Sequence, residues 1–387
     1  MNPNLRVAIV HDYLNQMGGA ERVVAVLHRL FPSAPIYTTI VDRERLLAEL
    51  QDADIRTTWM QRIPGILKRF KQFFWLYPLA VRSINLSDYD LVISSSSAYA
   101  IGAPVKTGAV HVCYCHTPMR FAWDFSAYME GMRLPALLKG LAKGLTLLLR
   151  IWDRTVARDV DLLIANSSVV RERVQACYGR ESKLVYPPVD VSRFSVSSLP
   201  SEDYYLVVSR LVSYKRIDLA VKACSELGVP LLVVGDGPDG DRLQSFAGGT
   251  VKFLGRLPDE QVVQYMQRCR ALLFPGLEDF GITPLEANAC GRPVIAYRGG
   301  GALDTIVPGL NGVFFDHQDA GSLADTLRAF EGYSWDPEAI REHAMQYDGS
   351  VFAESLLRSI RQALSKKDGL EAVDAELKRE RAYEVKL

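Results

Sequence analysis

The chain has 387 residues, of which 48% are hydrophobic, and it carries 45 basic and 45 acidic side chains. This length favours two domains, and the apolar content is enough to fill two cores. The balanced charge gives no general attraction for nucleic acid, so we expect no nucleic-acid partner. The six cysteines are scattered, mostly within apolar segments, which predicts reduced, buried thiols in a cytoplasmic protein.

The first residues run directly into an apolar segment at 5–10, so we expect no signal peptide. No uninterrupted apolar run reaches the ~20 residues that a membrane-spanning helix needs. The sequence therefore predicts a protein that is soluble or bound to a membrane surface.

Short β-rich segments alternate with longer helical patterns along the chain, which is typical of parallel, doubly wound sheets. Predicted strands lie at 6–10, 36–39, 91–94, 110–114, 162–165, 205–209, 231–235, 251–254, 271–274 and 294–296. Residues 187–201 contain three prolines and no apolar period, which predicts an interdomain linker. We expect an α/β protein with one Rossmann-like domain at 1–188 and a second at 202–348.

A last helical pattern at 350–364 places four apolar residues on one face: Phe352, Leu356, Ile360 and Leu364. Beyond it, the tail at 365–387 is rich in charge and only weakly periodic, and we assign it no function.

A glycine pair, Gly18 and Gly19, follows the first strand and its loop and begins a helix. Such a pair lets backbone approach a phosphate closely and exposes unpaired amides, although an ordinary turn has the same pattern. A complete Gly-x-Gly-x-x-Gly pattern is missing, so a nicotinamide or flavin cofactor is not predicted.

The segment 111–116 reads His-Val-Cys-Tyr-Cys-His, and strand alternation separates its polar side chains. His111, Cys113 and Cys115 fall on one face, with Tyr114 and His116 on the other. No second ligand pair with zinc-like spacing follows, so we expect no structural zinc. His116 falls at the carboxyl end of a strand, where open α/β sheets bind ligands, although an ordinary loop histidine fits equally.

Two cations, Arg210 and Lys215, flank the loop that follows the predicted strand at 205–209. A cation at a helix start opposes the helix dipole, but a bound diphosphate would reverse that effect and give the arginine a bidentate partner. Solvated surface residues are the simpler alternative.

Residues 278–286 read Glu-Asp-Phe-Gly-Ile-Thr-Pro-Leu-Glu and follow a predicted strand. Thr283 fits a helix N-cap, and Glu286 then falls three residues later, which predicts a capping box. The alternative is a ligand site, in which Glu278 and Glu286 accept from hydroxyl groups and the loop amides donate to phosphate. Asp-x-Asp triplets at 52–54, 88–90 and 239–241 occur at chance level, and we expect no bound metal.

Two segments have the composition of a membrane-surface contact. Residues 62–76 carry four basic side chains followed by aromatic residues, and residues 134–151 combine leucines with Lys139, Lys143 and Arg150 on one helical face. An ordinary helix packed on the sheet is the alternative. Peripheral contact with the cytoplasmic face of the inner membrane is the corresponding expectation.

The two glutamates spaced as Glu278 and Glu286, with Phe-Gly after the first, resemble the signature of retaining glycosyltransferase family 4. Segments 11–22, 209–216 and 114–118 resemble that family's phosphate loop, diphosphate clamp and cleft histidine, and the resemblance runs from about residue 6 to 359. The chain resembles in particular bacterial mannosyltransferases of O-antigen and exopolysaccharide synthesis.

The resemblance implies a GT-B fold, with two Rossmann-like domains facing across a cleft and the last helix returning to the first domain. It implies a hexosyltransferase that needs no cofactor or metal and moves mannose from GDP-mannose to a glycan acceptor, expected to be lipid-linked. Its implied contacts are the diphosphate for Arg210 and Lys215, the sugar for Glu278 and His116, the ribose for Glu286, and backbone donors at Gly18, Gly19, Phe280, Gly281, Ile282 and Thr283.

Three alternatives remain open at this point. They are a transferase of the same family that uses UDP-sugars, a sugar-nucleotide 2-epimerase, and a non-catalytic scaffold that binds sugar nucleotides. A requirement for acceptor separates transfer from epimerisation, and binding without turnover indicates the scaffold.

Overall fold

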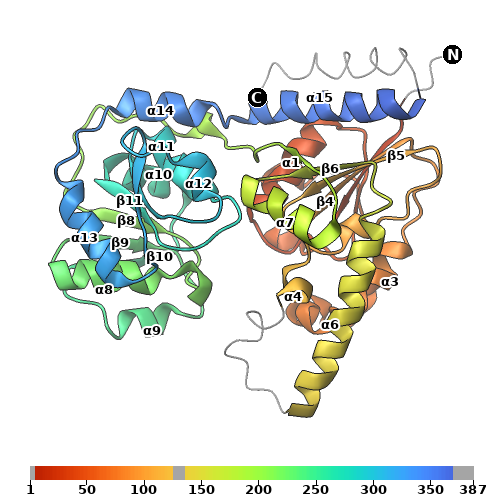
Figure 1. The fold of residues 1–387 in the computed structure, drawn as a ribbon, viewed down its shortest axis with the longest axis horizontal. Coiled ribbons are helices and arrows are strands. Elements are labelled where there is room, and N and C mark those ends of the chain that lie inside the picture. The colour runs from red at the N-terminus through yellow and green to blue at the C-terminus, as the bar shows by residue number, and fades with distance from the viewer. Residues whose placement is uncertain (1–4, 125–135, 369–387) are drawn as a thin grey trace. The chain divides into compact units, whose positions relative to one another are not determined.

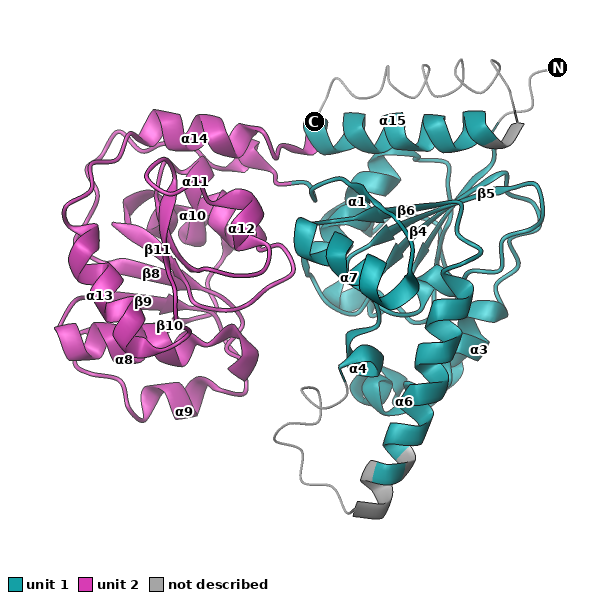
Figure 2. Ribbon diagram, in the orientation of Figure 1, with its two compact units in different colours: residues 1–188, 350–387 teal, residues 189–349 magenta. Residues whose placement is uncertain are grey.

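A computed structural model describes residues 5–124 and 136–368 of the chain (Figure 1). The chain divides into two compact units, coloured separately in Figure 2. Unit 1 comprises residues 1–188 and 350–387, and unit 2 comprises residues 189–349. Each unit is built around its own parallel sheet.

The sheet of unit 1 has the order β3-β2-β1-β4-β5-β6-β7 among the described residues, and all its strand pairs are parallel. The strand order reverses between β1 and β4. In open α/β sheets, ligands bind at the carboxyl ends of the strands beside such a reversal. The strands are β1 (Val7–His11), β2 (Ile36–Thr38), β3 (Ile55–Thr57), β4 (Leu91–Ser96), β5 (Val110–Cys115), β6 (Leu162–Ala165) and β7 (Lys183–Leu184).

Two helices, α1 (Gly19–Leu30) and α15 (Gly349–Asp368), pack on one face of this sheet and share a core with it. The predicted face of the last helix supplies Phe352, Leu356, Ile360 and Leu364 to that core. The other face is covered by α2 (Ile66–Arg69), α3 (Tyr77–Arg82), α4 (Arg120–Trp123), α6 (Ala136–Val156) and α7 (Ser168–Tyr178). Short 3-10 helices lie at Arg43–Arg45, Ala48–Leu50, Trp59–Arg62, Phe70–Phe73 and Ala100–Gly102.

The sheet of unit 2 is also parallel, with the order β10-β9-β8-β11-β12-β13, and it reverses between β8 and β11. Its strands are β8 (Tyr205–Val208), β9 (Leu231–Val234), β10 (Val251–Gly255), β11 (Ala271–Phe274), β12 (Val294–Tyr297) and β13 (Gly312–Phe315). Its helices are α8 (Ile217–Leu227), α9 (Gly240–Gln244), α10 (Asp259–Arg268), α11 (Ile282–Ala289), α12 (Ala302–Thr305), α13 (Ala320–Phe330) and α14 (Pro337–Met345), with 3-10 turns at Val191–Arg193 and Ser213–Lys215. Helices α8 and α13 share the main core with the sheet.

All ten predicted strands are present, with ends shifted by no more than two residues. The prediction missed β3, β7 and β13, which all lie at an edge of their sheet. An edge strand has a single neighbour, and those of unit 1 are partly or fully exposed, so they carry little apolar pattern.

The linker expected at 187–201 is wrong for most of its length, because residues from 189 onward belong to unit 2. Val191 and Phe194 are buried there. The Val189 amide donates to the Tyr347 carbonyl at 3.0 Å, so this irregular segment is anchored to the end of the same unit. Irregular backbone has no period, and for that reason its apolar residues gave no signal in the sequence.

All six cysteines are unpaired and buried, as their positions in apolar segments predicted. Within residues 5–124 and 136–368, no helix is both long enough and apolar enough to cross a membrane. Most of the predicted tail, from residue 369 onward, lies outside the described residues.

Candidate functional site

In unit 1, polar side chains gather at the carboxyl ends of three neighbouring strands: β1 and β4, which flank the reversal, and β5 beside them. His11 ends β1, Ser95 lies near the end of β4, and His116 follows β5 directly. All three are buried, with exposed fractions of 2%, 0% and 9%. They lie on the sheet face that α1 and α15 cover, because Ile9, Ile93 and Tyr114 two positions earlier belong to that core.

Hydrogen bonds connect these three residues. The Nδ1 atom of His11 lies 2.9 Å from the Ser95 carbonyl oxygen and 3.2 Å from Ser95 Oγ. The same Oγ lies 2.8 Å from Nε2 of His116. Burial lowers the pKa of His116 to about 3, and the charge of His11 adds to that effect. His116 is therefore a neutral imidazole at pH 7.

The loop that follows β4 is held by one carboxylate. Asp12 accepts hydrogen bonds from four successive backbone amides, those of Ser97, Ala98, Tyr99 and Ala100, at 2.6, 3.0, 2.7 and 2.6 Å. Such multiple donation compensates a buried carboxylate for its lost hydration. This contact fixes the backbone directly after Ser95.

A second serine–histidine pair lies on the opposite sheet face. Ser94 Oγ is 2.8 Å from Nε2 of His111, and both residues are buried. Cys113 and Cys115 pack on that same side, against α7. The predicted separation of the two faces in 111–116 is thus confirmed.

The glycine pair at the start of α1 differs from expectation. The Gly18 amide is not free, because it donates to Glu21 Oε2 at 3.0 Å in a capping arrangement. Glu21 is itself buried, which raises the pKa of its carboxyl group. Gly19, the first helical residue, is exposed. A phosphate role at this helix start therefore involves Gly19 rather than the Gly18 amide.

In unit 2, charged side chains gather at the carboxyl ends of β8 and β11, which again flank the reversal. Lys215 and Glu278 form an ion pair, with side-chain exposures of 16% and 18%. Arg210 follows β8, is exposed and donates to the Tyr214 hydroxyl at 3.5 Å. The Tyr214 ring also lies 5.5 Å from the Lys215 ammonium, so one aromatic side chain contacts both predicted cations.

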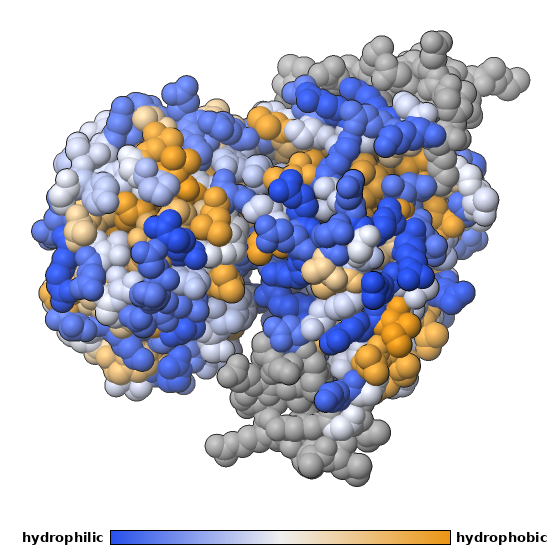
Figure 3. Space-filling model, in the orientation of Figure 1, coloured by the Kyte–Doolittle hydropathy of each residue, from blue (hydrophilic) through white to orange (hydrophobic). Residues whose placement is uncertain are grey.

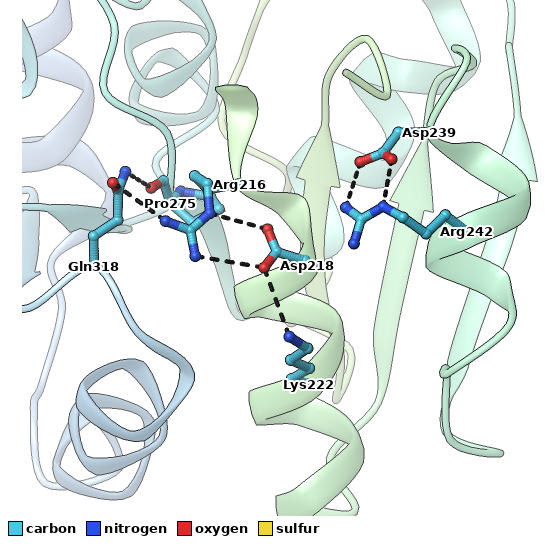
Figure 4. A network of polar contacts seen from close by, with 7 residues as sticks. All are labelled: Arg216, Asp218, Lys222, Asp239, Arg242, Pro275 and Gln318. Carbon is cyan, nitrogen blue, oxygen red and sulfur yellow. Dashed lines mark hydrogen bonds and ion pairs between the residues drawn. The ribbon is translucent and has the colours of Figure 1, made fainter. Parts of the chain in front are cut away.

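The residue after Lys215 has a backbone conformation that L-residues rarely adopt. Arg216 has φ of 51°, and it is the N-cap of α8. Its guanidinium contacts Asp218 at 3.2 Å and Gln318 at 3.4 Å, and Gln318 in turn donates to the Pro275 carbonyl (Figure 4). This network joins the loop carrying Lys215 to the end of β11, which carries Glu278.

The predicted start of α11 is wrong. The helix begins at Ile282 with Gly281 as N-cap, so Glu286 is its fifth residue and takes no part in a capping box. Gly281 has φ of 87°, and a side chain there would lie 2.6 Å from the Phe274 ring, so glycine is required. Thr283 and Pro284 are second and third in the helix, and proline is tolerated there because first-turn amides have no helical partner.

Glu286 is buried, at 9% exposure, and lies two residues further into the helix than predicted. Phe280 is also buried, and its ring packs against that of Tyr347. The amides of Ile282 and Thr283 lie in the first turn of α11, where helices offer donors to anions.

The three Asp-x-Asp triplets are bonded to basic residues. Asp54 pairs with Arg56, Asp90 with Arg6 and Asp239 with Arg242, the last of these shown in Figure 4. One aspartate of each triplet is thus engaged in an ion pair with an arginine.

The proposed membrane segments are only partly arranged as expected. Arg150 points inward, donating to the Ala122 carbonyl at 2.8 Å and lying over the Trp123 ring. Lys143 is exposed, but Leu134 and the Lys139 side chain lie outside the described residues. In residues 62–76, Phe73 and Phe74 pack on the core, whereas Trp75 is 48% exposed.

Sequence reasoning missed two residues that the geometry brings into these clusters, Ser95 and Tyr214. A run of four serines at 94–97, directly after an apolar strand, was a usable signal for Ser95. Tyr214 gave no signal, because an aromatic residue in an exposed loop has no distinguishing pattern.

Solved structures of similar fold define the class. The structure of HepE from Anabaena in complex with UDP matches with a TM-score of 0.70 and 18% identity, covering 92% of this chain and all of that one. With two parallel-sheet units of seven and six strands among the described residues, this likeness establishes a GT-B fold.

Family models match both parts of the chain. Residues 17–193 match "Glycosyltransferase Family 4", and residues 190–346 match "Glycosyl transferases group 1". The chain therefore belongs to the family 4 glycosyltransferases.

Two curated relatives are similar over part of the chain. The "D-inositol 3-phosphate glycosyltransferase" of Mycolicibacterium smegmatis is 29% identical, over 56% of this chain and 56% of that protein. A "GDP-mannose-dependent monoacylated alpha-(1-6)-phosphatidylinositol monomannoside mannosyltransferase" of Corynebacterium glutamicum is 30% identical, over 45% of this chain and 54% of that protein. The matched part is thus about half the length of either relative.

Proposed function

We propose that this protein is a retaining hexosyltransferase that moves mannose from GDP-mannose to a glycan acceptor. One observation carries the proposal: Arg210, Tyr214, Lys215 and Glu278 converge at the carboxyl ends of β8 and β11. Two cations and the first turn of α11 offer positive potential there, which matches a nucleoside diphosphate.

Each residue of this cluster has a role set by its chemistry. Arg210 and Lys215 neutralise the diphosphate, with the amides of Ile282 and Thr283 as further donors. Glu278 orients the lysine and accepts from a sugar hydroxyl. Glu286, which lies in α11 together with Ile282 and Thr283, accepts hydrogen bonds from the ribose hydroxyls. Gly19 and His116 of unit 1 complete the set proposed to contact the donor.

The reaction requires no enzyme nucleophile in this proposal. The acceptor hydroxyl attacks the anomeric carbon from the side of the departing diphosphate, and its proton passes to a phosphate oxygen. The C–O bond to the diphosphate breaks as the new glycosidic bond forms, so the configuration is retained. Stabilising the charge that develops on the leaving group is the main catalytic contribution.

The donor is inferred from a relative's name. The C. glutamicum protein is described as GDP-mannose-dependent, and its sequence is more similar to this chain than that of HepE. HepE was solved with UDP, but at 18% identity its likeness concerns the fold alone. We therefore propose GDP-mannose, with UDP-sugars as the competing donors in the test.

The test measures release of nucleoside diphosphate from GDP-mannose and UDP-sugars, with and without a lipid-linked glycan acceptor. We expect GDP release only when both GDP-mannose and acceptor are present, and an α-linked product by NMR. Conversion of the sugar nucleotide without acceptor would indicate an epimerase. Binding without any turnover would indicate a scaffold, and turnover of UDP-sugars alone would overturn the mannosyl assignment.

We further propose that unit 1 contacts the membrane through α6, at the cytoplasmic face. Leu145, Leu147, Leu148 and Ile151 are 38%, 54%, 64% and 58% exposed, and Figure 3 shows apolar side chains gathered over this helix. Exposed Lys143 lies on the same helix. An apolar helix face next to basic charge fits an anionic lipid surface, where a lipid-linked acceptor is held.

Vesicle sedimentation tests this contact. Replacing Leu147, Leu148 and Ile151 with serine should lower binding to anionic vesicles at least tenfold, because each leucine buried in lipid contributes about 1.5–3 kcal/mol. Leu303→Ser in unit 2 is the matched control, since Leu303 is 53% exposed and lies elsewhere. Equal vesicle binding by the triple variant and the wild type would contradict the proposal.

A further inference from the structure

The buried cluster His11, Ser95 and His116 determines which nitrogen of His116 carries a proton. The Ser95 carbonyl oxygen can only accept a hydrogen bond, so His11 Nδ1, 2.9 Å away, must be the donor. The same N–H also points toward Ser95 Oγ at 3.2 Å. The Ser95 hydroxyl cannot then donate to His11.

Among the described residues, the other hydrogen-bond partner of the Ser95 hydroxyl is His116. Ser95 Oγ lies 2.8 Å from His116 Nε2, and this distance suits donation from the hydroxyl to an unprotonated ring nitrogen. A neutral imidazole carries a single proton, so acceptance at Nε2 places that proton on Nδ1. Among the described residues, His116 Nδ1 has no hydrogen-bond partner within the protein.

We propose that His11 and Ser95 are positioning residues that fix the Nδ1–H tautomer of His116, so that His116 meets the nucleotide sugar as a neutral hydrogen-bond donor. This inference rests on the proposed function for the identity of the ligand. The oxygens of a sugar hydroxyl or of a diphosphate are acceptors suited to that N–H.

The surroundings keep the ring uncharged. Burial holds the pKa of His116 well below neutrality. The titratable groups nearby are His11 on β1, Glu21 on α1, which interacts electrostatically with His11, and Tyr114 on β5, whose ring lies 5.2 Å from that of His116. The anionic group among them, Glu21, is bonded to the Gly18 amide and interacts with His11, not with His116.

The backbone sets how the side chains of His11, Ser95 and His116 lie relative to one another. His11 and Ser95 are register partners in the β1–β4 pair, and the His116 amide donates to the Ser96 carbonyl at 2.8 Å. Asp12 holds the four amides that follow. The three side chains therefore need no ligand to bring them together.

NMR of the protein labelled with ¹⁵N-histidine reads the tautomer directly, because the nitrogen without a proton resonates far downfield of the protonated one. His116→Gln assigns the signal. We expect the wild-type ring to be neutral at pH 7, with Nδ1 protonated. This measurement needs no substrate, so it stands even if the protein transfers no sugar and the proposed function fails.

Kinetics of variants then tests the positioning role. Ser95→Ala should give a mixture of His116 tautomers and lower kcat about tenfold, which corresponds to about 1.4 kcal/mol of activation free energy. The KM for GDP-mannose should change less than twofold, because the variant loses one orienting hydrogen bond and keeps the donor contacts. The matched control is Ser94→Ala, which removes an equally buried serine–histidine bond on the other sheet face. It should leave both the His116 tautomer and kcat unchanged.

His11→Gln serves as a second variant if Ser95→Ala does not fold, and it should also mix the tautomers. A wild-type His116 that is protonated at Nε2, or charged at pH 7, would overturn the proposal. So would a Ser95→Ala variant that keeps both the wild-type tautomer and the wild-type kcat.

Discussion

The candidate clusters of the two units lie at equivalent places in their sheets but consist of side chains of different chemistry. In each sheet the cluster lies where the strand order reverses, at the carboxyl ends of the flanking strands. In unit 1 the residues are buried, and His116 is neutral. In unit 2 they are charged and partly exposed. Arg210 and Lys215 both contact Tyr214, and Lys215 forms an ion pair with Glu278. The same topology thus places a buried, hydrogen-bonded cluster in one unit and a cluster of partly exposed charges in the other.

The contrast has a physical cause. A buried polar group is stable only if its hydrogen bonds are made inside the protein, and this fixes its geometry. Exposed charges keep their hydration until a ligand replaces it, so they respond to ligand charge and to salt. Variants can therefore be chosen that change either a buried group of unit 1 or an exposed charge of unit 2.

The largest expected effect concerns a buried carboxylate of unit 1. Burial raises the pKa of Asp153 to about 7, although Trp123 and Tyr178 donate to it. Between pH 4 and 7 the folded protein then binds more protons than the unfolded chain, so the free energy of unfolding falls as pH rises. An asparagine side chain cannot ionise, so the free energy of unfolding of Asp153→Asn should not show this fall with pH. The fall in the wild type is of the order of 4 kcal/mol.

Denaturant unfolding at pH 4 to 8 measures this difference. Asp159→Asn, at an exposed position nearby, is the control and should follow the wild-type curve. If Asp153→Asn loses as much stability as the wild type over this range, Asp153 is not the group responsible.

A second prediction concerns the cations of unit 2. Lys215→Ala should lower kcat at least ~100-fold, by comparison with loss of one preorganised donor to a developing charge. Lys222→Ala is the control, because Lys222 also pairs with a carboxylate, Asp218, but on the far side of the network in Figure 4. Its kcat should stay within twofold of wild type. Near-wild-type turnover by Lys215→Ala would show that Lys215 does not neutralise the diphosphate.

The two clusters should respond differently to salt. Raising ionic strength from about 0.05 to 0.5 M shortens the Debye length to roughly a third, so donor affinity should weaken severalfold through the exposed charges of unit 2. The ratio of wild-type to Ser95→Ala kcat, which depends on a buried hydrogen bond, should not change. Titration calorimetry and steady-state rates at both salt concentrations check this, and a salt-dependent ratio would contradict the contrast.

The smallest effect is expected at Arg216. Its left-handed backbone costs a residue with a side chain about 1–2 kcal/mol, so Arg216→Gly relieves strain while losing the contacts to Asp218 and Gln318. Net stability should change by less than about 1 kcal/mol, whereas kcat should fall because Lys215 is less firmly held. Urea unfolding with kinetics tests this, and unchanged kcat would show that the network does not position Lys215.

The sequence was sufficient to predict the doubly wound architecture, because its central strands are buried and their apolar runs are long. It was insufficient at edges and in irregular segments: β3 and β7 carry little apolar pattern, and the buried segment around Val191 and Phe194 has no period to detect. At the site, residue types and spacing left ordinary structural alternatives open for Arg210, Lys215, Glu278 and His116, and their roles were predicted from the family resemblance. Spacing did not predict the start of α11, since Gly281 in a left-handed conformation competes with Thr283 as N-cap.

The contact between Ser95 and two histidines was beyond sequence reasoning for a different reason. It depends on the register of β1, β4 and β5, which brings together residues 84 and 21 positions apart. Only pairing between strands makes these residues neighbours.

A thermal-shift comparison of wild type and Lys215→Ala with GDP-, UDP- and ADP-sugars shows whether unit 2 binds the diphosphate of a nucleotide sugar. At about 100 times its dissociation constant, a ligand adds about 2.7 kcal/mol of stability. We expect GDP-mannose to stabilise the wild type and to have little effect on Lys215→Ala at the same concentration. Equal stabilisation of both proteins, or none of the wild type by any nucleotide sugar, would contradict this expectation.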